Sequence, residues 1–271
     1  MLLVLGIALF VVSGILIVIW VAQRRKLGSL ARAEVTTIGQ LAGLANAVNV
    51  ELERAGTGAG FSQLVGLSGQ VRADDPLTSE LAGERCVYYD YTVEREFEET
   101  YQETDSSTNQ RVTKTRTRTE TVAHGSRRTK FQLDDGTGTL TVDPEGASIE
   151  SVQVVERYEP APVGGGSIRI GPVTLGWDAP GLGSRRTLGY RYRERVLPLG
   201  SSVFVLGMAR GGGAAGLNVR KPDTGDRFLV SLKTREELVG STRRAVTWLL
   251  IASIALDAAG VVLVLLEVLR G

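Results

Sequence analysis

The pattern of hydrophobic and polar residues along the chain starts with a long hydrophobic run, Leu2 to Ala22, that contains no charged residue. A helix of about 20 apolar residues crosses a hydrocarbon core of roughly 30 Å, and a single segment in lipid must be helical because its backbone groups find partners only within it. The run ends at Arg24, Arg25 and Lys26, and it lacks the basic start and the small-residue cleavage site of a signal peptide. We therefore expect a transmembrane helix.

A second apolar run, Val246 to Leu266, contains one charged residue, Asp257. An ionisable group near the bilayer centre costs on the order of 3 kcal/mol on insertion scales. Asp257 is therefore expected to face another helix, of this chain or of a second copy, rather than lipid. Ser13 beside Gly14 is the expected place of close approach. These two runs predict contact with the lipid bilayer. They also predict a homo-oligomer formed through the transmembrane helices.

Basic residues at the inner ends of both runs set the expected orientation. Arg24, Arg25 and Lys26 follow the first run, and Arg243 and Arg244 precede the second. Lys and Arg next to a span favour the cytoplasmic side of the membrane. We expect a protein with two spans, its middle part on the cytoplasmic side and both termini outside.

Between the two runs, hydrophobic residues first recur every three to four positions and then every second position. The helical repeat from Ser29 to Glu53 predicts a neck helix that packs against the domain after it. From Leu64 onward the repeat of two predicts strands, separated by turns rich in Gly, Pro and Asp. The expected strands are Leu64 to Arg72, Cys86 to Phe97, Arg111 to Ala123, Thr129 to Leu133, Thr139 to Val142, Val152 to Tyr158, Leu188 to Leu197, Ser202 to Met208 and Arg227 to Ser231.

Short strands at such regular spacing favour a closed barrel or a sandwich. We expect a mainly β fold: an OB-like β-barrel or sandwich domain with a long charged hairpin, flanked by two transmembrane helices and an N-terminal neck helix. The OB-like plan rests on Phe131 to Pro144 and Val196 to Ala209, each with a glycine turn between strands. The expected parts are helix 1 at 1–23, neck helix and linker at 24–60, the β-rich domain at 61–240 and helix 2 at 241–271.

The charged hairpin combines an acidic strand with a basic one. Cys86 to Glu99 carries Asp and Glu on one face, and Arg111 to Ala123 alternates threonine with Lys114, Arg116 and Arg118. Opposite charges across antiparallel strands contribute roughly 0.2 to 1 kcal/mol per pair. Exposed Lys and Arg could also contact a partner protein or the phosphates of a nucleic acid. Because acidic neighbours neutralise the basic strand, we favour a structural role and a protein partner over nucleic acid.

Composition indicates little catalytic chemistry. The chain is 43% hydrophobic and 23% charged with a formal net charge of +1, which gives no general attraction to nucleic acid. Cys86 and His124 are its single cysteine and single histidine. The adjacent Asp134 and Asp135 would point to opposite faces of a strand rather than form an acid/base pair. We therefore predict no catalytic residues, no metal site and no cofactor.

Several stretches together resemble the GIDE domain, also called BAM, of MULAN-type mitochondrial ubiquitin ligases and their prokaryotic relatives. They are the charged hairpin, DDPLTSELAGERCVYYDY (Asp74 to Tyr91), FQLDDGTGTLTVDP (Phe131 to Pro144), YRERVLPLGSSVFVLG (Tyr192 to Gly207) and TREEL (Thr234 to Leu238). The resemblance covers nearly the whole chain. It implies a domain between two spans that recognises partners or substrates, with catalysis assigned to a RING finger after the second span.

A RING finger binds two zinc ions through about four Cys or His ligands each, which one cysteine and one histidine do not supply. We therefore expect a membrane-anchored, non-catalytic binding or scaffold module that recognises a partner protein next to the bilayer. One alternative is a ubiquitin-ligase-related or quality-control component that acts with a separate catalytic chain. The other is an OB-type binder of nucleic acid or nucleotide.

Overall fold

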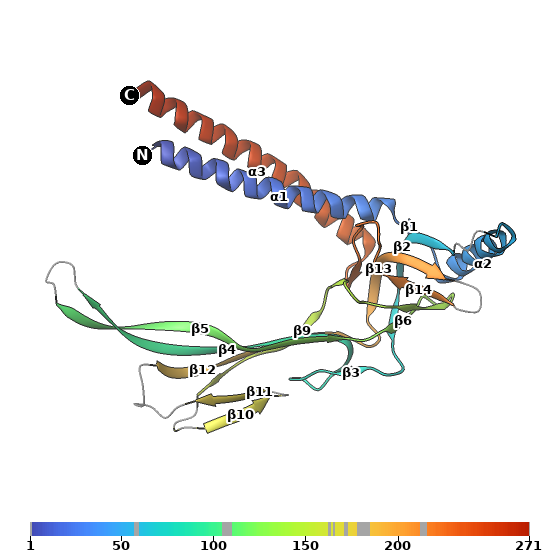
Figure 1. The fold of residues 1–271 in the computed structure, drawn as a ribbon, viewed down its shortest axis with the longest axis horizontal. Coiled ribbons are helices and arrows are strands. Elements are labelled where there is room, and N and C mark those ends of the chain that lie inside the picture. The colour runs from blue at the N-terminus through green and yellow to red at the C-terminus, as the bar shows by residue number, and fades with distance from the viewer. Residues whose placement is uncertain are drawn as a thin grey trace. The chain divides into compact units, whose positions relative to one another are not determined.

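The computed structural model describes residues 2–56, 60–104, 110–161, 164, 166–170, 173–177, 185–211 and 216–270. Its helices are α1 (Leu2–Arg32), α2 (Ile38–Arg54) and α3 (Arg235–Arg270) (Figure 1). The strands are β1 (Glu34–Val35), β2 (Ser62–Arg72), β3 (Leu77–Thr78), β4 (Arg85–Thr104), β5 (Arg111–Arg128), β6 (Phe131–Asp134), β7 (Thr139–Val142), β8 (Ser148–Ile149), β9 (Val152–Pro160), β10 (Gly166–Ile170), β11 (Val173–Trp177), β12 (Arg185–Pro198), β13 (Ser202–Gly211), β14 (Leu217–Arg220) and β15 (Leu229–Ser231). The mainly β fold with two long flanking helices confirms the predicted fold class.

The chain forms two compact units that alternate along the sequence. The first contains Met1–Gln70, Leu133–Ser148 and Ser202–Gly271, and the second contains Val71–Gln132 and Ile149–Ser201. The first unit holds all three helices and the second holds the long charged hairpin. The domain limits expected from the sequence, at 61–240, stay a prediction.

A closed five-stranded barrel forms most of the β part of the first unit, with β1 paired to β2 and β15 paired to β13 in the same sheet. Its strands follow the order β2, β6, β7, β14 and β13, and β13 closes the ring by pairing antiparallel with β2. The repeat of two is visible in β7, where Leu140 and Val142 are buried while Thr139 and Thr141 are exposed. Closure pairs the outermost strands with each other, so the ring has no open edge of its own.

The helical repeat expected from Ser29 to Glu53 forms two helices rather than one. α1 continues to Arg32, β1 pairs in parallel with β2, and α2 begins after Thr37. The Thr37 hydroxyl accepts a hydrogen bond from the backbone N–H of Gln40, and the Gln40 side chain accepts one from the N–H of Thr37. This capping box starts a new helix, which explains the break that the hydrophobic repeat alone did not indicate.

The neck helix α2 packs against the barrel, as predicted. The N–H of Ile38, which is buried, donates to Asp135 at 2.7 Å, and the N–H of Gly39 donates to the Thr137 hydroxyl at 3.0 Å. Burial raises the pKa of Asp135, but hydrogen bonds from Ile38, Thr137 and Gly138 outweigh it and hold this pKa below its ordinary value. The turn between β6 and β7 thus accepts hydrogen bonds from N–H groups that α2 leaves free at its start.

Helices α1 and α3 pack against each other, and both are long and apolar enough to cross a membrane (Figure 1). The Ser13 hydroxyl donates to the Ser253 carbonyl at 3.4 Å, and an added Cβ on Gly6 would lie 2.9 Å from a methyl group of Val264. Around Gly14 no described atom beyond its chain neighbours and its own helix backbone lies within 4 Å of an added Cβ. Ser13 therefore lies at the contact between the two helices, as expected, whereas the glycine of closest approach is Gly6 rather than Gly14.

The second unit is built on a sheet in the order β5, β4, β12, β9, with β3 paired to the start of β4. One face of β4 and β12 is buried and rich in tyrosine. Its core members are Cys86, Tyr89, Tyr91, Val93, Ala123, Tyr190, Tyr192 and Val196. β10 and β11 form a separate antiparallel hairpin. The expected pairing of the acidic strand with the basic strand is confirmed by the antiparallel register of β4 and β5.

Candidate partner-binding surface

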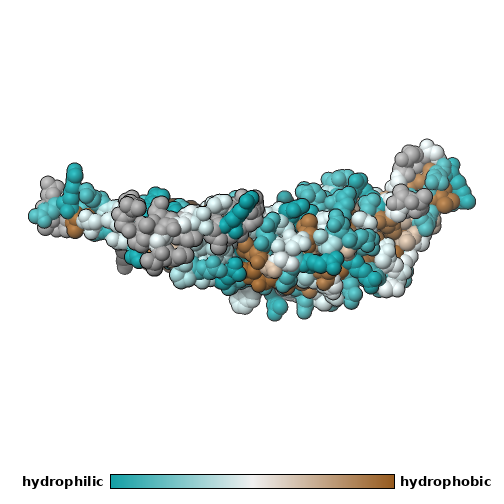
Figure 2. All heavy atoms as spheres, turned by 90° about the horizontal axis from the view of Figure 1, so that it is seen from below, coloured by the Kyte–Doolittle hydropathy of each residue, from teal (hydrophilic) through white to brown (hydrophobic). Residues whose placement is uncertain are grey.

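The outer part of the β4–β5 hairpin extends beyond the rest of its sheet. β12 pairs with β4 only as far as Glu99, whereas β5 pairs with it as far as Thr104. Side chains of both strands are exposed here, and hydrophilic residues cover this part in Figure 2. The connection between the strands, residues 105–109, lies outside the described residues. A two-stranded ribbon has no core of its own, so its side chains are available to a partner.

Glu99 of β4 forms ion pairs with three arginines from the two neighbouring strands. Arg116 donates to it through Nε at 3.0 Å and Nη2 at 2.8 Å, and Arg185 of β12 through Nε at 3.2 Å and Nη2 at 3.1 Å. Arg118 forms a looser ion pair at 3.6 Å. Hydrogen bonds from Arg116, followed by those from Arg185, lower the pKa of Glu99. We call these four residues the Glu99 cluster.

Two aromatic rings support the arginines of the Glu99 cluster. The guanidinium carbon of Arg116 lies 4.6 Å from the ring centre of Tyr101, and that of Arg185 lies 5.2 Å from the ring centre of Phe97. The guanidinium carbon of Arg95 also lies near Phe97, 5.1 Å from the ring centre. Two-point hydrogen bonding and stacking fix the planes of these guanidinium groups. Their remaining N–H donors therefore have a defined orientation.

The structure brings together two of the three basic residues that the sequence singled out, Arg116 and Arg118. Lys114 lies one step farther along β5 and pairs instead with Glu103 at 2.8 Å. The contribution of Arg185 was not predicted, because it comes from β12, 86 positions from Glu99 in the sequence. The repeated arginines of β12 were a signal in the sequence that this strand carries exposed basic side chains. They did not reveal that β12 would lie beside β4.

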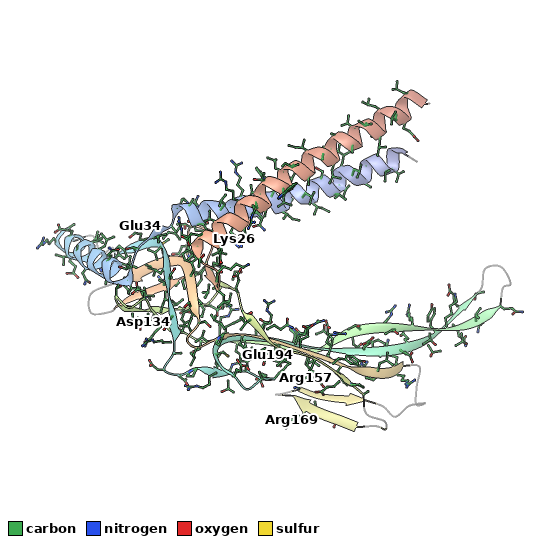
Figure 3. The ribbon with its side chains drawn as sticks, turned by 180° about the vertical axis from the view of Figure 1, so that it is seen from behind. Lys26, Glu34, Asp134, Arg157, Arg169 and Glu194 are labelled. Atoms are coloured by element: carbon green, nitrogen blue, oxygen red, sulfur yellow. The ribbon has the colours of Figure 1, made fainter. Side chains whose placement is uncertain are left out.

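Glu194 is the one fully buried charged residue among the described residues, and it lies on β12 (Figure 3). Its carboxylate accepts hydrogen bonds from the backbone N–H groups of Leu81 at 2.9 Å and Ala82 at 2.7 Å. The Ser79 hydroxyl donates a third, at 3.0 Å. Burial, and next the charge of Glu194, raise the pKa of the Cys86 thiol to about 11. The structure therefore joins two segments that carry the GIDE resemblance, DDPLTSELAGERCVYYDY and YRERVLPLGSSVFVLG.

The residues expected at the membrane lie on the two long helices. Arg24, Arg25 and Lys26 belong to α1, and Arg243 and Arg244 belong to α3. Their roles in setting the orientation stay a prediction.

Asp257 lies on the α3 face between Ser253 and Gly260, two buried residues at the contact with α1. It is half-buried and has no hydrogen bond or ion pair within the described part of the chain. The Ser13 hydroxyl, which the sequence suggested as its partner, bonds to Ser253 instead. Contact between Asp257 and a second copy stays a prediction.

The two residues with the greatest catalytic potential lie apart from any nucleophilic constellation. Cys86 is completely buried in the tyrosine-rich core, and His124 is exposed on β5 opposite Thr92. Across the described ranges, no three His, Cys, Asp or Glu residues converge as metal ligands.

These features define a protein with two candidate membrane spans and a β-rich part between them. A sequence model of the GIDE family, described as "E3 Ubiquitin ligase", matches residues 99–265. This match spans more than half of the chain, and the chain belongs to the GIDE family.

A curated relative supports a link to ubiquitin ligases. The chain is 29% identical over 139 residues to E3 ubiquitin-protein ligase SPL1 of Arabidopsis thaliana, an alignment that covers 49% of this chain and 38% of SPL1. The chain thus spans about two fifths of the length of that relative. No solved structure matches it. The protein is related to ubiquitin ligases by sequence.

Proposed function

We propose that the protein is a membrane-anchored recognition module that binds a partner protein through the Glu99 cluster. The observation that carries this proposal is the fixed, partly exposed arrangement of Arg116 and Arg185, whose side chains are 42% and 55% exposed while both hold Glu99. Arginine and aromatic residues in such rigid arrangements supply much of the binding energy of protein interfaces.

The charge balance of the cluster favours a protein over a nucleic acid. Lys114 and Arg116 each face a carboxylate across the hairpin, in Glu103 and Glu99. Nucleic-acid binding depends on unpaired basic groups that neutralise phosphates. A protein surface that presents both carboxylates and carbonyl groups matches the remaining N–H donors of the arginines better.

The family match supports a second candidate function for the same surface. A partner bound at the Glu99 cluster would be either a substrate of ubiquitin transfer or a catalytic chain that performs it. In both cases these 271 residues contribute binding, since the sequence has one cysteine and one histidine for zinc.

Site-specific photo-crosslinking of the full chain in its native membrane tests the proposal. A photoreactive residue in place of Lys114 lies on the face of β5 that carries Arg116, and one in place of Thr117 lies on the opposite face. We expect crosslinks to a defined protein from position 114, and their loss in Arg116→Glu/Arg118→Glu. Equal crosslinking from position 117, or crosslinks to RNA, would contradict the proposal.

A further inference from the structure

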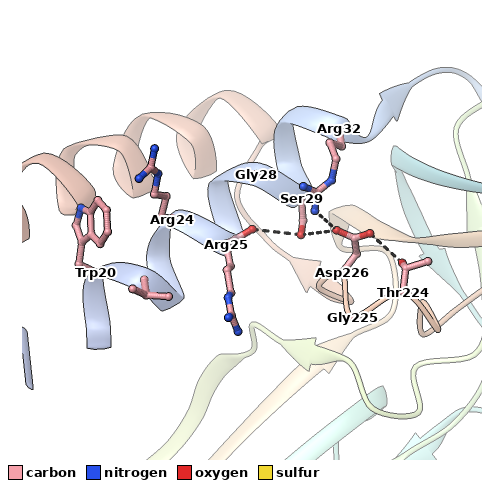
Figure 4. Close-up of a pocket in the computed structure, with 10 residues that line it drawn as sticks. Trp20, Arg24, Arg25, Gly28, Ser29, Arg32, Thr224, Gly225 and Asp226 are labelled. Atoms are coloured by element: carbon pink, nitrogen blue, oxygen red, sulfur yellow. Dashed lines mark hydrogen bonds and ion pairs between the residues drawn. The ribbon is translucent and has the colours of Figure 1, made fainter. Parts of the chain in front are cut away.

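A pocket lies on α1 where the apolar run gives way to basic residues. Its volume is about 660 Å³, and it extends from Trp20 to the turn formed by Thr224, Gly225 and Asp226 (Figure 4). All of its lining residues belong to the first unit. Indole rings prefer the level of lipid headgroups, so Trp20 marks the depth at which this pocket meets the membrane surface.

The charges around the pocket are unbalanced in favour of positive groups. Arg24, Arg25 and Arg32 line it together with a single carboxylate, Asp226, so that three positive charges oppose one negative charge. Arg32 already pairs with Asp226, whose pKa is lowered chiefly by that contact. Arg24 and Arg25 form no ion pair with any described residue. Arg24 and Arg25 therefore carry two positive charges that no described carboxylate neutralises.

The carboxylate of Asp226 is held away from these two arginines. The Ser29 hydroxyl donates to it at 3.0 Å, and the Thr224 hydroxyl donates at 2.9 Å. Together with Arg32, these groups satisfy both of its oxygens, as Figure 4 shows. Asp226 thus fixes one end of the pocket, and its charge is compensated before any ligand binds.

The pocket also contains open space and an unused hydrogen-bond donor. At Gly28, which lines the pocket, a guanidinium nitrogen of Arg32 at 3.6 Å is the one described atom within 4 Å of an added Cβ, apart from the chain neighbours and the helix's own backbone. The indole nitrogen of Trp20 is shielded from solvent and has no acceptor within the described chain. Arg24 lies with its guanidinium carbon 5.0 Å from the centre of the indole ring.

We propose that this pocket binds the phosphate-bearing headgroup of an anionic phospholipid. Arg24 and Arg25 supply positive charge, and Trp20 and Val21 supply an apolar wall beside the acyl chains. A free phosphate ion has no apolar part that could contact this wall, whereas a phospholipid has acyl chains. The wall therefore favours the lipid as the source of the phosphate. This site is separate from the Glu99 cluster, and the proposal does not depend on the function proposed above.

Quenching of Trp20 fluorescence by brominated lipids tests the proposal directly. The full chain carrying Trp177→Phe and Trp248→Phe retains Trp20 as its one tryptophan. It is reconstituted into phosphatidylcholine vesicles that contain lipid with brominated acyl chains, either phosphatidylglycerol or phosphatidylcholine. The preference is the ratio of Trp20 quenching by brominated phosphatidylglycerol to its quenching by brominated phosphatidylcholine. We expect this ratio to rise about fivefold for each arginine that contacts the headgroup.

Three variants in this background separate a pocket from general surface attraction. Arg24→Gln/Arg25→Gln removes the free charges, and Gly28→Leu fills the space while keeping every charge; both should bring the preference close to one. Arg243→Gln/Arg244→Gln removes the same amount of charge from residues that do not line the pocket, and it should keep the preference. Unchanged quenching by brominated phosphatidylcholine shows that each variant is inserted in the bilayer.

The opposite results overturn the proposal. No preference for phosphatidylglycerol would mean that the pocket does not select anionic lipid. An equal loss in Arg243→Gln/Arg244→Gln would mean that the arginines attract anionic lipid only through their general field. Preference retained in Gly28→Leu would mean that the pocket is not used. Inorganic phosphate in excess, at constant ionic strength, should leave the preference unchanged; its abolition would assign the site to a free anion.

Discussion

The hydroxyl of Ser79 donates a hydrogen bond to the buried carboxylate of Glu194 at 3.0 Å, across 115 positions of the sequence. The same carboxylate oxygen accepts from the N–H of Ala82, and its neighbour accepts from the N–H of Leu81. A buried charge is destabilising unless hydrogen bonds satisfy it. Glu194 therefore attaches the turn that follows β3 to the middle of β12, and both parts depend on this contact.

Glu194→Gln should destabilise the second unit. An amide replaces one carboxylate oxygen with an NH₂ group, which would then face an N–H or O–H donor in either orientation of the amide. We expect the free energy of unfolding to fall by about 1 to 3 kcal/mol, the usual consequence of an unsatisfied buried polar group. Urea unfolding of the full chain in detergent, followed by the near-ultraviolet circular dichroism of the tyrosine-rich core, measures this loss.

Glu156→Gln provides the matched control for that experiment. Glu156 lies on β9, and its side chain is 57% exposed next to Arg193 at 3.9 Å. Removing such an exposed pair should change the unfolding free energy by less than about 0.5 kcal/mol. Equal effects of the two substitutions would show that the hydrogen bonds of Glu194 are not a stabilising feature of this unit.

Gly6→Leu should weaken the contact between α1 and α3. An added Cβ at Gly6 would lie 2.9 Å from Val264 and 3.3 Å from the Gly260 carbonyl, so the helices would have to separate. Overpacking of this kind typically costs about 1 to 3 kcal/mol. Gly14→Leu is the control, because an added Cβ there has no described atom of another segment within 4 Å. A lower thermal midpoint in detergent for Gly6→Leu alone is the expected result, and a similar loss in both would contradict this helix contact.

The local patterns of the sequence predicted most of the elements. Alternation of buried and exposed residues identified β7 with its correct limits, Thr139–Val142, and the acidic and basic strands of the long hairpin. Apolar runs identified both long helices. These features depend on neighbouring residues in the chain, so a repeat of two or of three to four positions is enough to reveal them.

Contacts between segments that are distant in the sequence could not be predicted from such local patterns. The sequence indicated Arg116 and Arg118 but not Arg185, because the pairing of β12 with β4 is a tertiary property. It indicated Ser13 at the helix contact but not Gly6, since composition shows which residues are small but not which face of α1 meets α3.

Acid should loosen the Glu99 cluster. The pKa of Glu99 in the folded protein is below its ordinary value of 4.5, chiefly because of hydrogen bonds from Arg116. A carboxyl group whose pKa is lowered by folding stabilises the folded state above its unfolded pKa, and this contribution is lost as the pH falls through the folded value. Thermal midpoints measured from neutral pH down to acid should therefore fall more steeply for the unaltered chain than for Glu99→Gln.

An exposed carboxylate outside the cluster calibrates that comparison. Glu145 follows β7, and it is exposed and forms no ion pair among the described residues. Glu145→Gln should keep the steep decline of the unaltered chain. A decline in Glu99→Gln as steep as in Glu145→Gln would show that protonation of Glu99 does not control the acid sensitivity.

Cysteine labelling should place the β-rich part on the cytoplasmic side, as the basic residues beside the spans predict. Thr117→Cys provides an exposed thiol on β5, whereas native Cys86 is completely buried and its pKa is raised to about 11, so it stays unreactive at neutral pH. A membrane-impermeant maleimide should label Thr117→Cys only after cells are permeabilised, and it should label the unaltered chain only after denaturation. Labelling of Thr117→Cys in intact cells would place this part outside and would exclude nucleic acid and cytoplasmic proteins as its partners.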